Sequence, residues 1–433
     1  MRLNIKNFSK IKEASILVDG ITVIAGENNT GKSTVGKILF SLFNSVADIE
    51  KNVEQQRRTE IRERCRMILG NYDVLREDLR IRRSRFYLET ADEIIFQIFE
   101  LQEKQNHILP EQVYTILENV LEPLYEKDRE FEYRELLQNL LKNIVNILNI
   151  SGEVISLELL TRYFDRIFSG QMNSLLDQSS DAFLDLMIKD KHITLLFQNH
   201  ICSDYQSSIL LLNKAVYIDN PFVIDVLNHY SDLNPIDSYL KDLLQRQRGE
   251  NDGYGVIESV IVKEKLNEIY QTLQKVVEGK IVVKKGDGFY LEKEGFYQPV
   301  SFSNLSTGLK SFVILKMLLE KGLLLEKDVL ILDEPEIHLH PQWQIVYAEL
   351  IVLLQKYFDL SIVVTTHSPY FLDALNLFSV KHGIDEKVNY YLSSMDQGHV
   401  KMEYVTDRID SVYERMASPI QILESLRYEL NNR

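Results

Sequence analysis

The stretch Gly26-Glu27-Asn28-Asn29-Thr30-Gly31-Lys32-Ser33 decides the fold of this chain. It fits the pattern G-x-x-x-x-G-K-[ST], a phosphate-binding loop between a strand and a helix. The apolar run 21–25 before it is typical of a buried strand, and 32–43 after it is typical of a helix. Glycines in such a loop let backbone N–H groups converge on phosphate oxygens at the N-terminus of the helix. The sequence therefore predicts a nucleotide site here.

Three side chains at the end of the loop are expected to carry its chemistry. Lys32 reaches the β- and γ-phosphates in this prediction, Ser33 ligates Mg²⁺, and Thr34 assists. A chance glycine-rich turn is the alternative, which the flanking strand and helix disfavour. The predicted ATP-binding residues of the loop are Gly26, Glu27, Asn28, Asn29, Thr30, Gly31, Lys32, Ser33 and Thr34.

A second apolar run, 329–332, ends in the carboxylates of Asp333 and Glu334. Asp333 at the end of a buried strand suits the shell of the Mg²⁺, and Glu334 suits a general base that orients the attacking water. Acidic residues that simply mark the end of a strand are the alternative. After a complete phosphate loop, the catalytic interpretation is favoured.

Several motifs together resemble the OLD/RecF/SMC-like branch of the ABC-type ATPases. Residues 304–310 (NLSTGLK) resemble the ABC signature, and 333–341 (DEPEIHLHP) resemble the Walker B and D-loop run of the branch. Residues 365–369 (TTHSP) resemble its switch-histidine loop, and the opening LNIKNF at 3–8 also matches. These motifs lie within 1–45 and 300–375.

The resemblance implies a head-to-tail dimer in which two chains enclose two ATP molecules. Ser306 and Gly308 would then contact the nucleotide of the partner, and His367 would sense the γ-phosphate. A core histidine that caps a helix is the alternative for His367. His338 and His340 are two residues apart, so they are either metal ligands or, as favoured here, D-loop residues that pack at the dimer interface.

No glutamine that matches the Q-loop of these ATPases stands out. The run Asp219-Asn220-Pro221 follows the short apolar strand 215–218 and occupies a plausible place for that loop. No zinc-hook pattern C-x-x-C occurs in the chain. The residues after 373 do not carry the acidic pattern of a TOPRIM nuclease.

The fold class predicted from these patterns is α/β. We expect an ABC-type P-loop ATPase head, with a parallel sheet core and a small antiparallel β part, that carries a large α-helical insertion. The predicted boundaries are 1–45 for the first part of the head, 46–210 for the helical insertion, and 211–433 for the second part of the head. Apolar residues recur at helical spacing within the insertion.

Composition limits the function classes. The chain has 433 residues with 64 acidic and 49 basic side chains, and its net charge of −15 excludes DNA wrapping over the whole surface. Two cysteines, Cys65 and Cys202, provide neither a disulfide framework nor a four-cysteine zinc site. The most apolar stretch, 313–332, is interrupted by charges, so we expect a cytoplasmic protein that does not insert into a membrane.

One segment is basic, although the chain as a whole is acidic. Between residues 57 and 85 there are ten arginines and five acidic residues. Contact with a nucleic acid or an acidic phage protein is one interpretation, and a solvated helix face with internal Glu–Arg pairs is the other. The candidate contacts are Arg57, Arg58, Arg62, Arg76, Arg80, Arg82, Arg83 and Arg85.

An OLD-like ATPase without a nuclease domain resembles the ATPase subunits of two-gene antiphage systems of the Septu (PtuA) and PARIS (AriA) types. The resemblance implies ATP and Mg²⁺ as cofactors, and it implies self-association as a dimer, a hexamer or another higher oligomer. It also implies a separate nuclease effector as partner. The alternatives are a RecF-like DNA repair or recombination ATPase and an ATP-gated assembly scaffold with negligible turnover.

Overall fold

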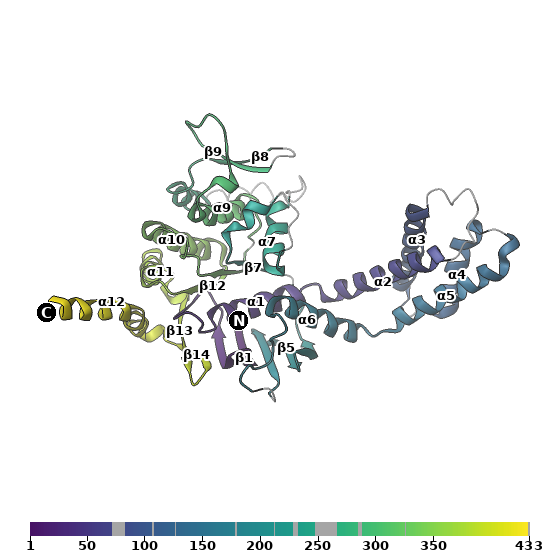
Figure 1. Ribbon diagram of the computed structural model, residues 1–433, viewed down its shortest axis with the longest axis horizontal. Coiled ribbons are helices and arrows are strands. Elements are labelled where there is room, and N and C mark those ends of the chain that lie inside the picture. The colour runs from purple at the N-terminus through teal and green to yellow at the C-terminus, as the bar shows by residue number, and fades with distance from the viewer. Residues whose placement is uncertain are drawn as a thin grey trace. The chain divides into compact units, whose positions relative to one another are not determined.

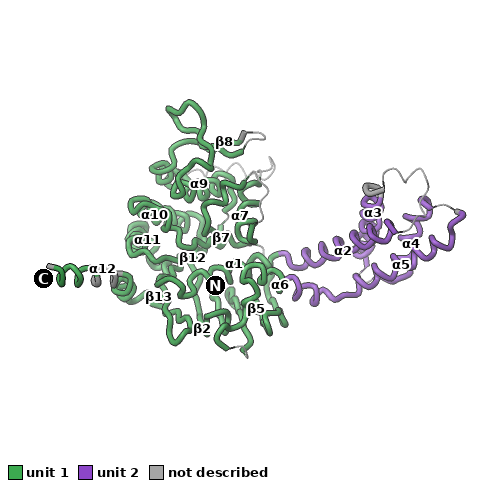
Figure 2. The backbone as a smooth tube through the Cα atoms, in the orientation of Figure 1, with its two compact units in different colours: residues 1–47, 160–433 green, residues 48–159 purple. Residues whose placement is uncertain are grey.

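The chain forms two compact units, which Figure 2 shows in different colours. The head unit comprises residues 1–47 and 160–433, and the insert unit comprises residues 48–159. The computed structural model describes residues 1–71, 83–105, 108–125, 127–177, 180–211, 213–227, 233–246, 266–284, 288–324 and 326–431.

Five parallel strands form the centre of the head unit (Figure 1). Their order in the sheet is β13-β3-β12-β11-β7. Almost every residue of the inner strands is buried, since helices cover both faces and a continuous apolar run is then favoured. The strands are β3 (Ile21–Gly26), β7 (Ala215–Ile218), β11 (Val329–Asp333), β12 (Ser361–Thr366) and β13 (Val388–Asp396).

Helices from distant parts of the chain cover this parallel sheet. Helix α1 packs on the face that presents Ile331 and Tyr217, where Gly36 touches both side chains. A second core lies on the other face and includes Leu332 and Val364 together with residues of α9, α10 and α11. Figure 1 shows α10 and α11 side by side near β12. The helices are α1 (Lys32–Val46), α7 (Pro235–Gln245), α9 (Thr307–Glu320), α10 (Pro341–Phe358), α11 (Pro369–His382) and α12 (Asp410–Asn431).

Six further strands extend the same sheet in the order β6-β5-β4-β1-β2-β14. Neighbours in this part are antiparallel except for β14 and β2, which run parallel, and β14 pairs antiparallel with β13. These strands are β1 (Arg2–Phe8), β2 (Ile11–Leu17), β4 (Ala182–Ile188), β5 (Lys191–Gln198), β6 (Ile201–Ser207) and β14 (His399–Tyr404). A separate antiparallel sheet contains β8 (Lys280–Lys284), β9 (Gly288–Glu292) and β10 (Val300–Ser301). The predicted α/β class, with its parallel core and an antiparallel part, is confirmed.

The predicted helical insertion over 46–210 differs from the observed insert unit, which ends at residue 159. Residues 182–207 form the strands β4, β5 and β6, and β4 pairs with β1 through partners such as Leu3 and Leu186. The physical reason lies in the alternation along β4, where Leu184 and Leu186 are buried and Asp185 between them is half-buried. A period of two over seven residues is a weaker signal than the helical spacing of the runs that precede it.

The insert unit is helical and has its own apolar core. Ile61 and Cys65 of α2 pack in this core with residues of α3, α4 and α5. The helices are α2 (Ile49–Asn71), α3 (Arg83–Lys104), α4 (Pro110–Leu121), α5 (Glu130–Asn149) and α6 (Gly152–Phe168), of which α6 continues into the head unit. Short 3-10 helices are η2 (Glu122–Leu124), η3 (Lys127–Arg129), η4 (Pro221–Val226), η5 (Phe302–Asn304), η6 (Asp385–Lys387) and η7 (Thr406–Arg408).

Within the described residues, no single helix is long and apolar enough to cross a membrane. The consecutive helices α5 and α6 pass that test only as a pair, by length and composition. Both cysteines are free and buried, and burial raises the pKa of each thiol to about 12.

Candidate functional site

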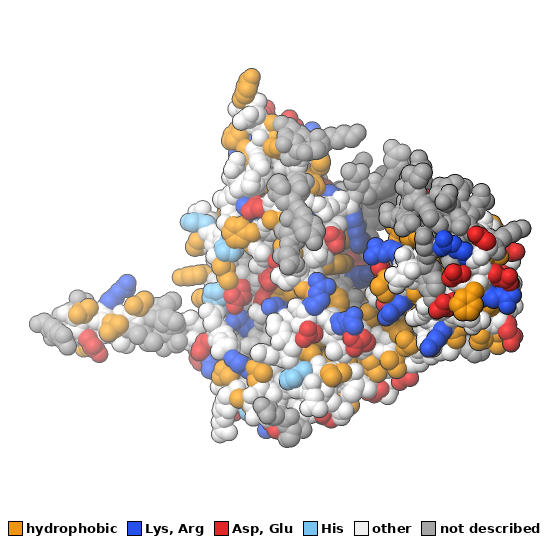
Figure 3. All heavy atoms as spheres, turned by 45° about the vertical axis from the view of Figure 1, so that its right-hand side comes forward, with side chains coloured by type: hydrophobic (Ala, Val, Ile, Leu, Met, Phe, Trp, Pro, Cys, Tyr) orange, Lys and Arg blue, Asp and Glu red, His pale blue; other side chains and the backbone are white. Residues whose placement is uncertain are grey.

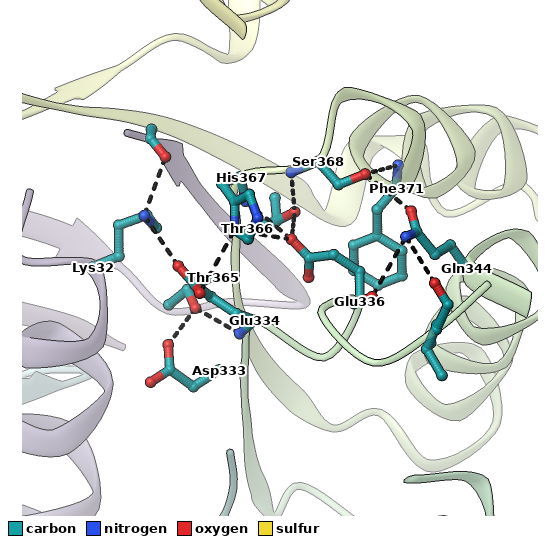
Figure 4. Close-up of polar contacts among 12 residues, drawn as sticks. Lys32, Asp333, Glu334, Glu336, Gln344, Thr365, Thr366, His367, Ser368 and Phe371 are labelled. Carbon is teal, nitrogen blue, oxygen red and sulfur yellow. Dashed lines mark hydrogen bonds and ion pairs between the residues drawn. The ribbon is translucent and has the colours of Figure 1, made fainter. Parts of the chain in front are cut away.

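The candidate site lies where three neighbouring parallel strands end. The phosphate loop follows β3. Asp333 is the last residue of β11 and Glu334 comes directly after it, and His367 follows β12. Because the carboxyl ends of parallel strands meet at one edge of the sheet, residues about 300 positions apart in the chain come together there. Figure 4 shows these side chains converging from the three loops.

The phosphate loop begins helix α1. Gly31 caps the helix with a φ of 79°, a left-handed conformation that favours glycine. The Lys32 side chain is only 3% exposed, and its Nζ donates to the carbonyl oxygens of Gly26 at 3.1 Å and Glu27 at 2.8 Å. The Oγ1 of Thr30 donates to the Glu27 carbonyl at 2.7 Å. The loop is therefore curled around the lysine ammonium.

The tip of the loop is exposed and is supported from two sides. Glu27, Asn28 and Asn29 are all exposed. Lys10, in the turn between β1 and β2, donates to Asn29 Oδ1 at 2.9 Å, and Arg415 of α12 lies 3.6 Å from Glu27 Oε1. Ser33 and Thr34 are half-buried at the start of α1.

Asp333 is held by hydroxyl groups on both carboxylate oxygens. Ser33 Oγ donates to Oδ1 at 3.0 Å, and Thr365 Oγ1 donates to the same oxygen. Tyr217 OH donates to Oδ2 at 2.6 Å. In an octahedral Mg²⁺ shell, with metal–oxygen distances of about 2.1 Å, adjacent ligands are about 3 Å apart. The oxygens of Ser33 and Asp333 fit that spacing, and both are ligand types that Mg²⁺ prefers.

Glu334 lies between the lysine and the histidine. Its Oε1 is 3.2 Å from Lys32 Nζ, and its Oε2 is 3.5 Å from His367 Nδ1. Its backbone has a φ of 48°, and its N–H donates to Thr365, at 3.1 Å to the carbonyl oxygen and 2.9 Å to Oγ1. The carboxylate is 20% exposed, so water reaches it. A carboxylate in this position is able to orient a water molecule or accept its proton.

Glu336 fixes the loop that carries His367. Its Oε1 accepts hydrogen bonds from Thr366 Oγ1 at 2.5 Å and from the His367 backbone N–H at 3.0 Å. The side chain is 2% exposed, and burial raises the pKa of its carboxyl. Ser368 follows in the loop and caps α11, because its Oγ accepts a hydrogen bond from the Phe371 backbone N–H. The same hydroxyl donates to Gln344 Oε1 at 2.9 Å. His367 therefore has a fixed backbone and a 42% exposed ring.

The signature residues lie at the start of α9. Ser306 is the N-cap residue and is exposed, and no hydrogen bond from the helix caps its side chain. Gly308 is buried, and its Cα lies against the carbonyl of His338 and the ring of Trp343 in the D-loop region of the same chain. The buried Lys310 side chain forms an ion pair with the half-buried Asp225 of η4 at 2.6 Å. The signature helix is thereby joined to the D-loop region and to η4.

The two D-loop histidines have different surroundings. His338 is exposed and makes an edge contact with Phe222 at 5.9 Å, and His340 Nδ1 accepts a hydrogen bond from Gln342 N at the start of α10. Among the described residues, no group of three or more His, Cys, Asp or Glu side chains is arranged to hold a metal ion. The metal-ligand alternative for His338 and His340 therefore has no supporting geometry in that part of the chain.

The run 219–221 leads from β7 into η4. Asn220 accepts from Phe222 N at 3.0 Å and donates to Asp237 Oδ2 at 3.1 Å, so its side chain caps η4. Desolvation of the Asp219 carboxyl group, with repulsion from Asp237 and Asp333, raises its pKa to about 6. The Q-loop position stays a prediction for this run.

The described part of the arginine segment forms internal contacts. Arg58 pairs with Glu54 at 2.6 Å and stacks on Phe99, and Arg62 pairs with Asp92 at 2.6 Å. Arg57 donates to the Ile150 carbonyl at 2.7 Å. Arg64 and Arg66 pair with Glu60 and Glu63. Figure 3 shows basic and acidic side chains intermingled on the helical unit, on the face in view.

These contacts favour a solvated helix face over a polyanion site for the described arginines, because exposed Glu–Arg pairs on one helix are common. Arg76, Arg80 and Arg82 lie outside the described residues. Arg83 and Arg85 belong to α3, but their side chains are also outside the described part.

Sequence reasoning assigned no role to three residues of this site. From the sequence, Tyr217 is one position of the apolar strand 215–218, and Thr365 is the first residue of the TTHSP motif. Glu336 is one residue of the DEPEIHLHP motif. A polar group inside an otherwise apolar buried strand is the signal for Tyr217 and Thr365, because such a group needs a hydrogen-bond partner.

Comparisons with known proteins found one matching family and several similar solved structures. The family described as AAA ATPase domain matches residues 1–372. Among solved structures, the SMC head domain from Thermotoga maritima is 12% identical, with a TM-score of 0.38, over 93% of this chain and 98% of that chain. An SmcHead bound to the C-winged helix domain of ScpA is 12% identical, with a TM-score of 0.43, over 95% of this chain and 98% of that chain. No curated protein matches the chain.

Proposed function

This chain belongs to the AAA ATPase domain family, and from that premise we propose that it is an Mg²⁺-dependent ATPase of the ABC type that works as a head-to-tail dimer. One observation carries the proposal. Glu334 lies 3.2 Å from Lys32 and 3.5 Å from His367, and the three residues come from the ends of three adjacent strands. The Ser33–Asp333 pair lies beside them.

Each side chain has a defined task in the proposed reaction. The Lys32 ammonium exchanges its contact with Glu334 for the β- and γ-phosphates of ATP, which neutralises their charge. Glu334 is then free to orient a water molecule for in-line attack, and His367 contacts the γ-phosphate from the end of β12. Ser33 and Asp333 would hold Mg²⁺, which would supply positive charge to offset the negative charge of the phosphates.

Ser306 and Gly308 are proposed to complete the site of a second copy. The exposed Ser306 stands at the N-terminus of the 14-residue helix α9, where a hydroxyl and backbone donors favour a phosphate. Thr34 and the loop Gly26–Thr30 complete the nucleotide site within one chain. At the finer level we propose that this dimer is a sensor or scaffold that holds a separate nuclease effector in antiphage defence, on the basis of the DEPEIHLHP and TTHSP runs.

A phosphate-release assay distinguishes an ATPase from a scaffold that binds ATP without hydrolysing it. We expect Mg²⁺-dependent release by the purified chain and, where a neighbouring gene encodes a nuclease, a changed rate when that nuclease is added. Tight ATP binding without release in either condition would favour the ATP-gated scaffold instead. Absence of any effect of that nuclease on binding, on rate and on phage resistance would contradict the defence role.

The Ser306→Arg variant tests the assignment across the interface. A bulky cation at this exposed N-cap should prevent ATP-dependent dimer formation, measured by light scattering, while the chain still binds ATP through its own loop. Ser203→Arg on the exposed edge strand β6 is the matched control, and it should dimerise normally.

A mixing experiment sharpens the same prediction. Ser306→Arg and Glu334→Gln chains should each be inactive alone. A mixed dimer carries the Ser306→Arg substitution at only one of its two interfaces, and the other interface is an intact composite site, because the first chain supplies Glu334 and the second supplies Ser306. We expect partial recovery of turnover in the mixture. Dimerisation of Ser306→Arg at the unsubstituted level would contradict the assignment.

A further inference from the structure

Tyr217 is a buried tyrosine of strand β7 whose hydroxyl reaches the proposed metal site. Its side chain is 1% exposed, and its OH donates to Asp333 Oδ2 at 2.6 Å. β7 pairs in parallel with β11, and Tyr217 lies opposite Ile331, two residues before Asp333. The strand register therefore places the phenol beside the carboxylate at the end of the next strand.

The ring of Tyr217 is fixed by its neighbours. It lies against α1, where a Cβ added at Gly36 would be 3.1 Å from Tyr217 Cε2 and 3.0 Å from Ile331 Cγ2. On α1, Phe40 makes an edge contact with the ring at 5.9 Å. A tightly packed ring has little freedom to turn its hydroxyl away from Asp333. The absence of a side chain at Gly36 thus leaves room for the ring next to the phosphate-loop helix.

The two oxygens of Asp333 have different partners. Oδ1 accepts from Ser33 and Thr365, whereas Tyr217 is the donor to Oδ2. The terminal torsion of an aspartate is broad, so donors on both oxygens are needed to define one orientation.

We propose that Tyr217 is a positioning residue for Asp333. By holding Oδ2, it keeps Oδ1 next to Ser33 Oγ, in the orientation that suits a divalent cation. This inference rests on the proposed function, because it concerns the Mg²⁺ dependence of the same site. Without the phenol, buried Oδ2 would lose its donor, and the carboxylate would be free to turn away from the orientation that suits the cation.

The Tyr217→Phe variant tests this role, since it removes one oxygen and keeps the ring. The readout is equilibrium binding of a non-hydrolysable ATP analogue, titrated with Mg²⁺. We expect the Mg²⁺ concentration at half-maximal affinity to rise about tenfold, as for the loss of one hydrogen bond to a charged acceptor. Affinity without Mg²⁺ should not change. Turnover should show the same Mg²⁺ shift and recover at high Mg²⁺.

Tyr347→Phe is the matched control. Tyr347 of α10 is also fully buried, but its hydroxyl has no hydrogen-bond partner among the described residues. The control should keep the Mg²⁺ dependence of the unsubstituted protein. Gly36→Ala offers a second variant, because the added methyl group displaces the ring while the hydroxyl remains, and it should shift the Mg²⁺ dependence in the same direction.

The outcomes separate the inference from the proposed function. If the unsubstituted protein shows Mg²⁺-dependent binding and Tyr217→Phe behaves identically, the positioning role is wrong and the ATPase proposal stands. If Tyr217→Phe weakens binding equally with and without Mg²⁺, the residue acts through packing, which also overturns the inference. If the unsubstituted protein does not bind the analogue at all, the proposed function itself fails.

Discussion

Glu334→Gln should bind ATP and form a stable closed dimer while phosphate release falls about 10²- to 10³-fold. Glutamine keeps the size of the side chain but cannot accept a proton from the attacking water. It also removes the negative charge that pairs with Lys32 at 3.2 Å, so the lysine becomes available to the phosphates and ATP affinity should hold or increase. Phosphate release and light scattering with ATP measure the two effects.

Glu349→Gln is the matched control for this variant. Glu349 of α10 is a buried glutamate that pairs with Lys275 at 3.4 Å and with Lys381 of α11 at 2.8 Å, and neither lysine belongs to the proposed catalytic site. Its loss should lower the melting temperature but leave the rate per folded molecule unchanged. Hydrolysis by Glu334→Gln at the rate of the unsubstituted protein would mean that another group is the base.

Lys32→Ala should weaken ATP binding about ten- to a hundredfold. The ammonium contributes charge-assisted hydrogen bonds to phosphate oxygens, each of which stabilises by about 1.5–3 kcal/mol. The substitution also leaves the buried carbonyl of Gly26 without its donor, so a lower melting temperature is expected as well. Titration of a fluorescent ATP analogue measures the affinity, and thermal unfolding without nucleotide measures the stability.

A second buried lysine separates these two effects. Lys316 of α9 is 6% exposed, and its Nζ donates to the Gly279 carbonyl at 2.6 Å. Lys316→Ala should therefore lower stability in a similar way and leave ATP affinity unchanged. Equal losses of ATP affinity in both variants would show that Lys32 matters only for folding.

The sequence predicted the centre of the sheet well, because its signals are local. The runs 21–25, 329–332 and 361–365 predict buried strands, and the structure has β3, β11 and β12 there. Each run is mostly apolar, and each is followed by a motif that needs a strand end. The carboxyl ends of parallel strands then bring Lys32, Asp333 and His367 to one edge without further information.

The edge of the sheet was not predicted, because its strands carry a weaker signal. In β4 and β5 the apolar positions alternate, and each strand has fewer than nine residues. Read alone, such short segments between helical runs do not reveal that β4 pairs with β1, whose Leu3 is nearly two hundred residues away. The predicted C-terminal boundary of the insertion, residue 210, therefore lies after the observed one at residue 159.

What the sequence alone determined is the set of chemical groups: a phosphate loop, two carboxylates at a strand end, a signature serine and a histidine loop. Only the tertiary structure decided which hydroxyl groups hold Asp333 and which side chain holds the His367 loop. Strand order, strand register and packing against α1 bring three side chains to their hydrogen-bond partners: Tyr217, Thr365 and Glu336. Such contacts join residues that are far apart in the chain, so no local pattern encodes them.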